Sequence, residues 1–506
     1  MKDQAVPTSV SVISESVEQI EQNLPKKPIT DSAEVIANVE SDDDSGFLNA
    51  SNGSLNACEA EEEDIPSWRL KIPAKREAMT DEEVATTLKT MWSEADSIEP
   101  LEKRKKWVME RLTEAFGNVL PEPLLEISAA FVFEGDTGIS MDIRPEWLDM
   151  DKFRRGQKFA VDNIFGLFYS ELLSLFMVYS FEDGFKSILV TGNSSTPYAC
   201  FKRYLSTASR FYNWYSHDVW TPGNPGYDDM RAVRRIHSLM RKKLEAMPNE
   251  ELESKIKIEN PWCPALDIAR RDFQSTCPAP APNQCPYTIL SKYPNIRHKA
   301  LNQGEMAATQ FAFIALTVLS PKTFGLHDAT DEDLEAYCHL WRGLGYLLGV
   351  DDDFNFCRGT LEDVKARSRD FIEFWVKPNF RDIQPEWEHV MRCMIEGIQY
   401  YFPGSTYETC LCDLADVLNL HIPRFYSALS YASWIRHGFI RFFFDHGSKC
   451  APLRGYLNSQ LVQSMERARQ YDEKKLSELQ EKSAKTLKTV AAEKEKCSAS
   501  MRECLE

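Results

Sequence analysis

A single histidine, His237, lies in the middle of the basic segment RAVRRIHSLMRKKL (231–244). Helical spacing would place it on one apolar stripe with four other residues, Met230, Val233, Met240 and Leu244. Most of the arginine and lysine side chains would lie off this stripe, so His237 would face the interior. An inward imidazole is either a core residue with a satisfied hydrogen bond or a metal ligand, and this segment alone leaves both open.

The segment just upstream, TPYACFKRYLSTASRFYNWY (196–215), contains a second set of polar groups on an apolar helix. Arg203 and Thr207 are four residues apart and share a face, and Ser206 adjoins them. Phe211 and Trp214 continue that face, so a cation and a hydroxyl would lie beside an aromatic wall. The alternative is a surface arginine and a threonine whose hydroxyl bonds back to its own helix.

Other chemistries find little support in the residue pattern. A di-iron carboxylate site needs two Glu-x-x-His pairs, and the chain has one, Glu386 and His389. No phosphate-binding loop, nucleophile elbow, H-E-x-x-H or C-x-x-C motif is present. The segment GLGYLLG (343–349) follows a helical pattern, so we expect its glycines to let another helix or a flat ligand approach closely. His339 on the same segment is expected to be a packed residue rather than a ligand.

Composition indicates a large globular protein of the all-α class. The chain has 506 residues, 43% of them hydrophobic, and a net charge of −18. Two thirds of that charge lies in the first 65 residues, so no broad electrostatic attraction to nucleic acid is expected. We predict a disordered acidic segment at 1–66, a single large helical domain at 67–460 and a charged, solvated helical tail at 461–506.

Several helices can be placed within the central region. Thr330 and Thr360 each precede a helical pattern with an aspartate at the third position, which resembles a capping box. Residues 302–319 form a helix that is apolar nearly all round and therefore central. The apolar segment 164–181 has Glu171 at its middle and is barely long enough to span a bilayer, so we interpret it as a core helix.

The expected location is the cytoplasm, or the cytosolic face of a membrane. The N-terminus has no basic start followed by an apolar core, and the 13 cysteines are scattered, which favours reduced thiols in the cytosol. The segment WIRHGFIRFFFDHG (434–447) alternates basic and aromatic residues. It could rest on a membrane interface or form a buried helix with a basic edge.

The order and spacing of these motifs resemble the rubber-oxygenase, or latex-clearing protein, family, which also contains the fungal prenyl-cleaving oxygenase of mycophenolic acid synthesis. The resemblance rests on the R-x-x-x-T helix, the thirty residues from Thr207 to His237, and the segments TQFAF (309–313) and HLWRGLGYLLGV (339–350). It covers most of residues 140–440 and implies a single all-α domain that holds haem b. By the same resemblance, His237 is the proximal iron ligand, and Arg203 and Thr207 lie on the distal side.

The resemblance also implies oxidative cleavage of a carbon–carbon double bond, with dioxygen, in a small apolar substrate such as an isoprenoid or unsaturated lipid. At Ser206 the latex-clearing proteins carry a lysine that can occupy the distal side of the iron, and serine is too short to do so. Arg234, followed by Arg241, is the first candidate to pair with the haem carboxylates. Phe211, Trp214, Phe311 and Phe313 are candidates for the apolar wall. Two alternatives remain open: a haem-binding sensor or lipid carrier without turnover, and a helical interaction scaffold in which His237 and His339 are core residues.

Overall fold

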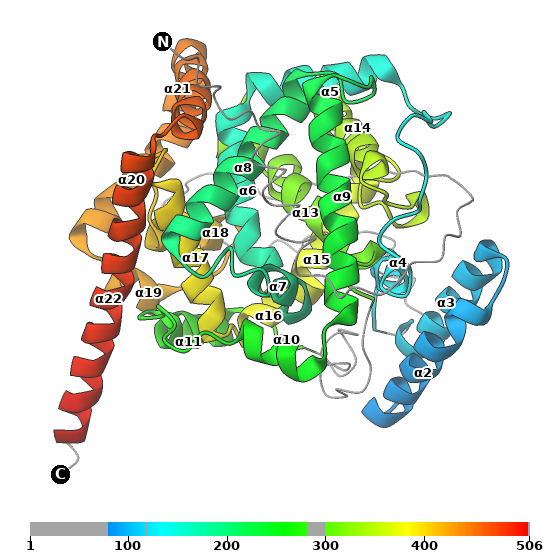
Figure 1. The fold of residues 1–506 in the computed structure, drawn as a ribbon, viewed down its shortest axis with the longest axis horizontal. Coiled ribbons are helices and arrows are strands. Elements are labelled where there is room, and N and C mark those ends of the chain that lie inside the picture. Colours follow the sequence, from blue (N-terminus) through cyan, green and yellow to red (C-terminus); the bar gives the residue numbers. More distant parts are fainter. Residues whose placement is uncertain (1–78, 118, 281–298, 504–506) are drawn as a thin grey trace, which may run out of the picture.

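The computed structural model describes residues 79–117, 119–280 and 299–503, and it confirms the expected all-α class. These residues form α-helices joined by loops and short helical turns, with no β-strand among them. Figure 1 shows how the helices are arranged. Most of their buried apolar side chains belong to one continuous core. The acidic segment 1–66, which is predicted to be disordered, lies outside the described residues.

The first helices lead from an N-terminal pair to the apolar centre of the molecule. Their bounds are α2 Asp81–Glu94, α3 Leu101–Phe116, α4 Glu122–Ala130, α5 Met150–Asp162, α6 Ile164–Val178 and α7 Glu182–Leu189. Helix α6 contains Glu171 and is largely buried, as expected for a core helix. No single helix among the described residues is long and apolar enough to cross a bilayer; α5 and α6 pass that test only as a pair, and they meet at a bend of 88°.

The middle helices include the two segments that carry the candidate site. Their bounds are α8 Pro197–Ser216, α9 Pro225–Ala246, α10 Asn249–Ile256, α11 Leu266–Thr276, α13 Gln303–Leu319 and α14 Asp331–Leu347. Helix α13 is buried on nearly all sides, as its composition predicts. The capping box predicted at Thr330 is present, because Thr330 and Asp333 each bond to the other's backbone N–H.

The later helices complete the body and form the C-terminal tail. Their bounds are α15 Leu361–Phe371, a π-helical turn Ile372–Val376, α16 Lys377–Phe380, α17 Pro385–Ile398, α18 Tyr407–Val417, α19 Pro423–Ala428, α20 Tyr431–Asp445, α21 Ala451–Arg469 and α22 Glu473–Glu503. The capping box predicted at Thr360 is also present.

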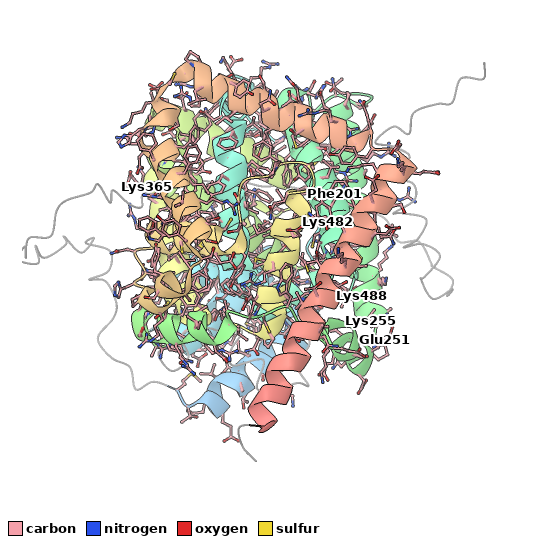
Figure 2. All side chains as sticks on the ribbon, turned by 90° about the vertical axis from the view of Figure 1, so that its left-hand side faces the viewer. Phe201, Glu251, Lys255, Lys365, Lys482 and Lys488 are labelled. Atoms are coloured by element: carbon pink, nitrogen blue, oxygen red, sulfur yellow. The ribbon has the colours of Figure 1, made fainter. Side chains whose placement is uncertain are left out.

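The charged tail is helical, but its first part is not solvated. Helix α21 runs through the predicted boundary at residue 460, and α22 crosses the face of the molecule shown in Figure 2. Lys482 forms an ion pair of 2.7 Å with Glu396 on α17. The buried hydroxyl of Ser483 accepts a hydrogen bond of 3.1 Å from the backbone N–H of Tyr198, in the first turn of α8 where such donors lack a helical partner. The expectation of a wholly solvated tail is therefore wrong, because the polar seam of α22 docks on α8 and α17.

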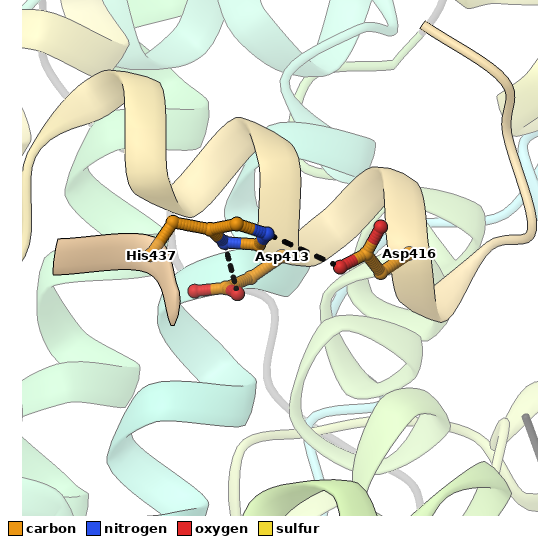
Figure 3. Close-up of side chains that lie close together, drawn as sticks. All are labelled: Asp413, Asp416 and His437. Atoms are coloured by element: carbon orange, nitrogen blue, oxygen red, sulfur yellow. Dashed lines mark ion pairs between the residues drawn. The ribbon is translucent and has the colours of Figure 1, made fainter. Parts of the chain in front are cut away.

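Helix α20 is held against α18 by a histidine that lies between two aspartates (Figure 3). His437 Nδ1 lies 2.9 Å from Asp413 Oδ1, and His437 Nε2 lies 3.4 Å from Asp416 Oδ2. These three side chains are close enough together to be considered as metal ligands. Because the two ring nitrogens face different carboxylates, the arrangement is that of an imidazolium in two ion pairs rather than of converging ligand atoms.

Candidate functional site

A cavity of about 1750 Å³ lies among helices α6, α7, α8, α9, α13 and α14. Small-molecule sites usually measure about 300–1,000 Å³, so this space exceeds what one such ligand fills. Its lining is mainly apolar, but polar and charged side chains line it from many elements, including α6, α7, α8, α9, α10, α13 and the residues around α16 and α17. The cavity is therefore the candidate site, and the predicted residues differ in whether they line it.

His237 lines this cavity from the middle of α9. The predicted stripe is observed, since Met230, Met240 and Leu244 are buried on the same face. Neither ring nitrogen of His237 has a hydrogen-bond partner in the described part of the chain, and Nδ1 is fully buried. Burial lowers the pKa of His237 to about 4, with a further contribution from Arg241. The imidazole is thus neutral at physiological pH and keeps a lone pair that no protein group uses.

Three predicted residues of α8, Arg203, Ser206 and Thr207, line the same cavity. Arg203 Nη1 donates a hydrogen bond of 3.0 Å to Ser194 Oγ. Within the described residues, the hydroxyl of Thr207 makes no bond to its own helix, whereas Ser209 Oγ donates to the carbonyl of Leu205 at 2.8 Å. The polar face predicted on α8 therefore opens into the cavity that His237 lines.

Arg234 is placed elsewhere. It does not line the cavity, and its Nε lies 3.0 Å from Asp136 Oδ2 while its Nη1 lies 3.4 Å from the Leu347 carbonyl oxygen. Arg241 is likewise engaged, because its Nε and Nη2 both lie 3.3 Å from the carbonyl oxygen of Leu301. Both arginines lie within one turn of His237 and on nearly the same face of α9, so the helical period alone does not separate them from the cavity. Their contacts with Asp136 and with the carbonyl oxygen of Leu301 hold the two guanidinium groups elsewhere.

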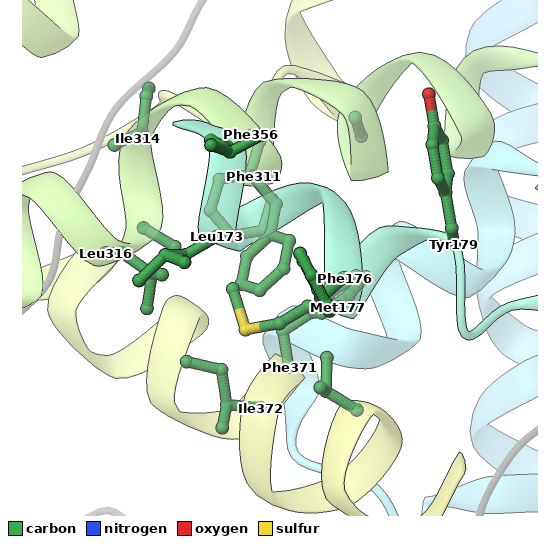
Figure 4. Packing of buried hydrophobic residues seen from close by; sticks show 14 of the residues in the cluster. Leu173, Phe176, Met177, Tyr179, Phe311, Ile314, Leu316, Phe356, Phe371 and Ile372 are labelled. Carbon is green, nitrogen blue, oxygen red and sulfur yellow. The ribbon is translucent and has the colours of Figure 1, made fainter. Parts of the chain in front are cut away.

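The aromatic wall is formed by Phe211, Trp214, Phe313 and Trp341. The rings of Phe313 and Trp341 stack at 4.3 Å, and the edge of Phe211 meets Phe313 at 4.6 Å. Phe311, also expected in the wall, is instead fully buried and stacks on Phe371 at 4.2 Å (Figure 4). Figure 4 shows Phe311 on the side of α13 that meets Leu173 and Met177 of α6. Phe313 is two residues further along α13, so the helical period places it on a different face.

Two residues that line the cavity, Glu171 and Arg210, are not predicted as site residues from the sequence. Glu171 lines the cavity from α6, and burial raises its pKa to about 8 although Tyr215 OH donates a hydrogen bond of 3.1 Å to it. The signal was a carboxyl group in the middle of an apolar helix. Arg210, three residues after Thr207, also lines the cavity, and its closest ion-pair partner, Asp229, is 3.9 Å away. Nothing in the sequence distinguishes Arg210 from the other arginines of α8 and α9.

Two further histidines and two glycines serve the packing of the described helices. His339 Nε2 lies 3.1 Å from the backbone N–H of Asp149, and His389 Nδ1 accepts a bond of 2.8 Å from the backbone N–H of Trp262. Both are satisfied core residues. At Gly343 a Cβ atom would lie 2.6 Å from the ring of Phe153, and at Gly345 it would lie 2.3 Å from Gln310 Nε2. These glycines thus admit neighbouring protein elements, the first of the two roles expected for them.

The donor set of the cavity is compatible with haem b. An enclosed, neutral imidazole without a hydrogen-bond partner is suited to binding iron. Arg203 and Arg210 are cations at the cavity wall that could pair with the two carboxylates of haem. The aromatic rings and the volume suit a flat apolar group. These residues therefore fit the group that the resemblance implies; the arginines at the cavity wall are Arg203 and Arg210, and the expected Arg234 is not among them.

Comparison of the chain with models of known families, with curated proteins and with solved structures found no match in any of the three.

Proposed function

We propose that this protein is a haem b-dependent oxygenase that cleaves a carbon–carbon double bond in a small apolar substrate, an isoprenoid or unsaturated lipid, with dioxygen. The observation that carries the proposal is the imidazole of His237, neutral and without a hydrogen-bond partner, in the wall of a cavity that Arg203 and Thr207 also line. Leaving a buried polar group unsatisfied costs about 1–3 kcal/mol, so a ligand to that nitrogen would remove a real destabilisation.

In this proposal the imidazole of His237 would hold the iron of haem. Arg203 and Arg210, which both line the cavity, would pair with the haem carboxylates. Burial has removed solvent from the guanidinium group of Arg210 and lowers its pKa, so a carboxylate beside it would be stabilising. The hydroxyls of Ser206 and Thr207, one turn from Arg203 on α8, are free to donate to a polar ligand in the cavity. Ser206 is too short to bind the iron itself, so it acts as a hydrogen-bond donor.

Haem supplies activation of dioxygen at its iron when it is bound. Phe211, Phe313 and Trp341 bind the hydrocarbon chain and exclude water from it. Glu171 holds a proton at its carboxyl group at neutral pH, so it does not place a charge in the apolar space. Cleavage of one double bond by one dioxygen gives two carbonyl groups that contain both oxygen atoms, and no other reductant is consumed.

The cofactor is tested by the absorption spectrum of protein purified from cells supplied with haem precursor. We expect a Soret band that is lost in His237→Ala and kept in His339→Ala, a matched change of a second buried histidine on α14. The spectrum needs no substrate. A colourless wild-type protein that also fails to bind added haemin would overturn the proposal.

A haem-binding sensor or lipid carrier is the second candidate, and Ser206 in place of the family's lysine is the residue that favours it. The two functions separate when the haem-loaded protein is incubated with an unsaturated isoprenoid under ¹⁸O-labelled dioxygen. An oxygenase gives labelled carbonyl products by mass spectrometry. A carrier binds the isoprenoid stoichiometrically and returns it unchanged.

A further inference from the structure

Helix α20 exposes a large aromatic surface that the proposed function does not use. Nine large apolar residues are exposed among the described residues, and seven of them lie on α20 and the first turns of α21. They are Tyr431, Trp434, Ile435, Phe439, Phe442, Leu453 and Tyr456. Scattered exposed apolar residues are normal, but a concentration of this kind marks an interaction surface. We call these seven residues the α20 patch.

The patch arises because α20 is apolar on both sides. Its inner side carries Phe444, which stacks on Phe165 and Tyr169 of α6, and His437, which is fixed between Asp413 and Asp416 of α18. Its outer side carries Tyr431, Ile435, Phe439 and Phe442, spaced at i, i+4, i+8 and i+11 along one stripe. Tyr431, Trp434 and Phe439 are 79%, 60% and 68% exposed. The inner contacts thus hold the aromatic stripe outward in the folded protein.

The segment that carries the patch is basic although the whole chain is acidic. Residues 431–456 contain four arginine or lysine residues and one aspartate, Asp445, whereas the net charge of the chain is −18. Two of the cations, Arg454 and Arg441, are near Asp328 and Asp416. Arg436 and Lys449 are exposed and form no ion pair with any described residue. The surface therefore presents exposed aromatic rings flanked by unpaired cations.

From this combination we infer that the α20 patch binds the surface of a bilayer that contains anionic phospholipid, with α20 lying in the plane of the interface. Tryptophan and tyrosine are favoured at the level of lipid headgroups, where one end of the ring is wet and the other is apolar. Basic side chains beside such a stripe are attracted to anionic headgroups. The inference rests on α20 and α21 alone and does not depend on haem.

The test is co-sedimentation of the full chain with vesicles of phosphatidylcholine, with or without 30 mol % phosphatidylserine. We expect binding to the anionic vesicles, weaker binding to the neutral ones, and a decrease with salt. The double variant Trp434→Ser/Phe439→Ser should lower the partition coefficient at least about ten-fold. Arg436→Gln and Lys449→Gln should each lower it about five-fold on anionic vesicles only.

Matched controls change the same kinds of residue elsewhere on the surface. Leu101→Ser/Ile143→Ser removes two exposed apolar side chains, and Lys485→Gln/Lys488→Gln removes two exposed cations of α22; both should leave vesicle binding unchanged. All altered side chains are exposed, and the helical circular dichroism should be the same in every variant. Absence of vesicle binding by the wild type would overturn the inference. So would a wild-type dimer in sedimentation equilibrium that Trp434→Ser/Phe439→Ser converts to a monomer without any change in vesicle binding, because the patch would then contact a second copy of the chain.

Discussion

Nδ1 of His437 on α20 lies 2.9 Å from Oδ1 of Asp413 on α18, and Asp413 also accepts a hydrogen bond from Tyr169 on α6. One buried carboxylate thus joins three helices. Although burial alone would lower the pKa of His437, the contacts with Asp413 and Asp416 raise it to about 9. Removal of the imidazolium would leave Asp413 buried with a single hydrogen-bond donor, which is a costly state for a carboxylate.

This ion pair predicts a pH-dependent contribution to stability. The pKa of His437 is higher in the folded chain than the ordinary 6.5, so its contribution is complete below pH 6.5 and is lost as the pH rises through about 9. We expect His437→Gln to lower the free energy of unfolding by about 2 kcal/mol at pH 6, a figure reduced for screening by solvent. At pH 10 the variant and the wild type should differ little. Urea unfolding at both pH values measures this difference, and an equal loss at pH 6 and pH 10 would contradict the charged pair.

Glu171 also predicts a loss of stability as the pH rises, but its substitution should stabilise the protein rather than destabilise it. Burial raises the pKa of this carboxyl group to about 8, so the folded protein binds a proton that the unfolded chain releases above pH 4.5. Wild-type stability should therefore fall between pH 4.5 and pH 8 through this residue. We expect Glu171→Gln to be about 1–3 kcal/mol more stable than the wild type at pH 9 and about equal to it at pH 4. The exposed Glu94→Gln is the control and should show no such trend.

Replacement of His237 and of His339 by leucine should have different effects on the free energy of unfolding. His339 Nε2 is bonded to the backbone of Asp149, so His339→Leu should lower the free energy of unfolding of the haem-free protein by about 1–3 kcal/mol. His237 makes no hydrogen bond with any residue that the structure describes, so His237→Leu should change the free energy of unfolding by less than about 1 kcal/mol or stabilise the protein. Denaturant unfolding of both variants without haem decides this comparison. A larger loss at His237 than at His339 would mean that the imidazole of His237 has a structural role.

The ion pair between Arg234 and Asp136 predicts that substitutions of the two residues are energetically coupled. The two side chains are only 13% and 20% exposed, and the pair holds the pKa of Asp136 below its usual range despite burial. We expect Arg234→Met and Asp136→Asn each to lower the free energy of unfolding by about 3 kcal/mol. Arg234→Met leaves the buried carboxylate of Asp136 without its ion-pair partner, and Asp136→Asn leaves the guanidinium group of Arg234 without one. The double variant should lose clearly less than the sum of the two. If the losses add, the contact is not a coupled pair and Arg234 is free to act elsewhere.

The sequence by itself determined the helices and much of the face that each one turns inward. Capping at Thr330 and Thr360 depends on residues three apart, and the stripe that contains His237 depends on the 3.6-residue period, so both can be derived locally. The same period placed Arg203, Ser206 and Thr207 on one face of α8. These are properties of single helices and do not depend on how the helices meet.

The tertiary structure alone determined which residues each helix face contacts. The helical period does not predict that Arg234 contacts Asp136 while Arg210 lines the cavity. Nor does it predict that Phe311 packs on Phe371, so that Trp341 rather than Phe311 belongs to the aromatic wall. The helical period also does not predict that α22 packs on α8 through Ser483, or that one of the two apolar sides of α20 is exposed. The physical reason is that a helix with more than one apolar or charged face has several orientations of similar local energy. Contacts between residues far apart in the chain choose among them.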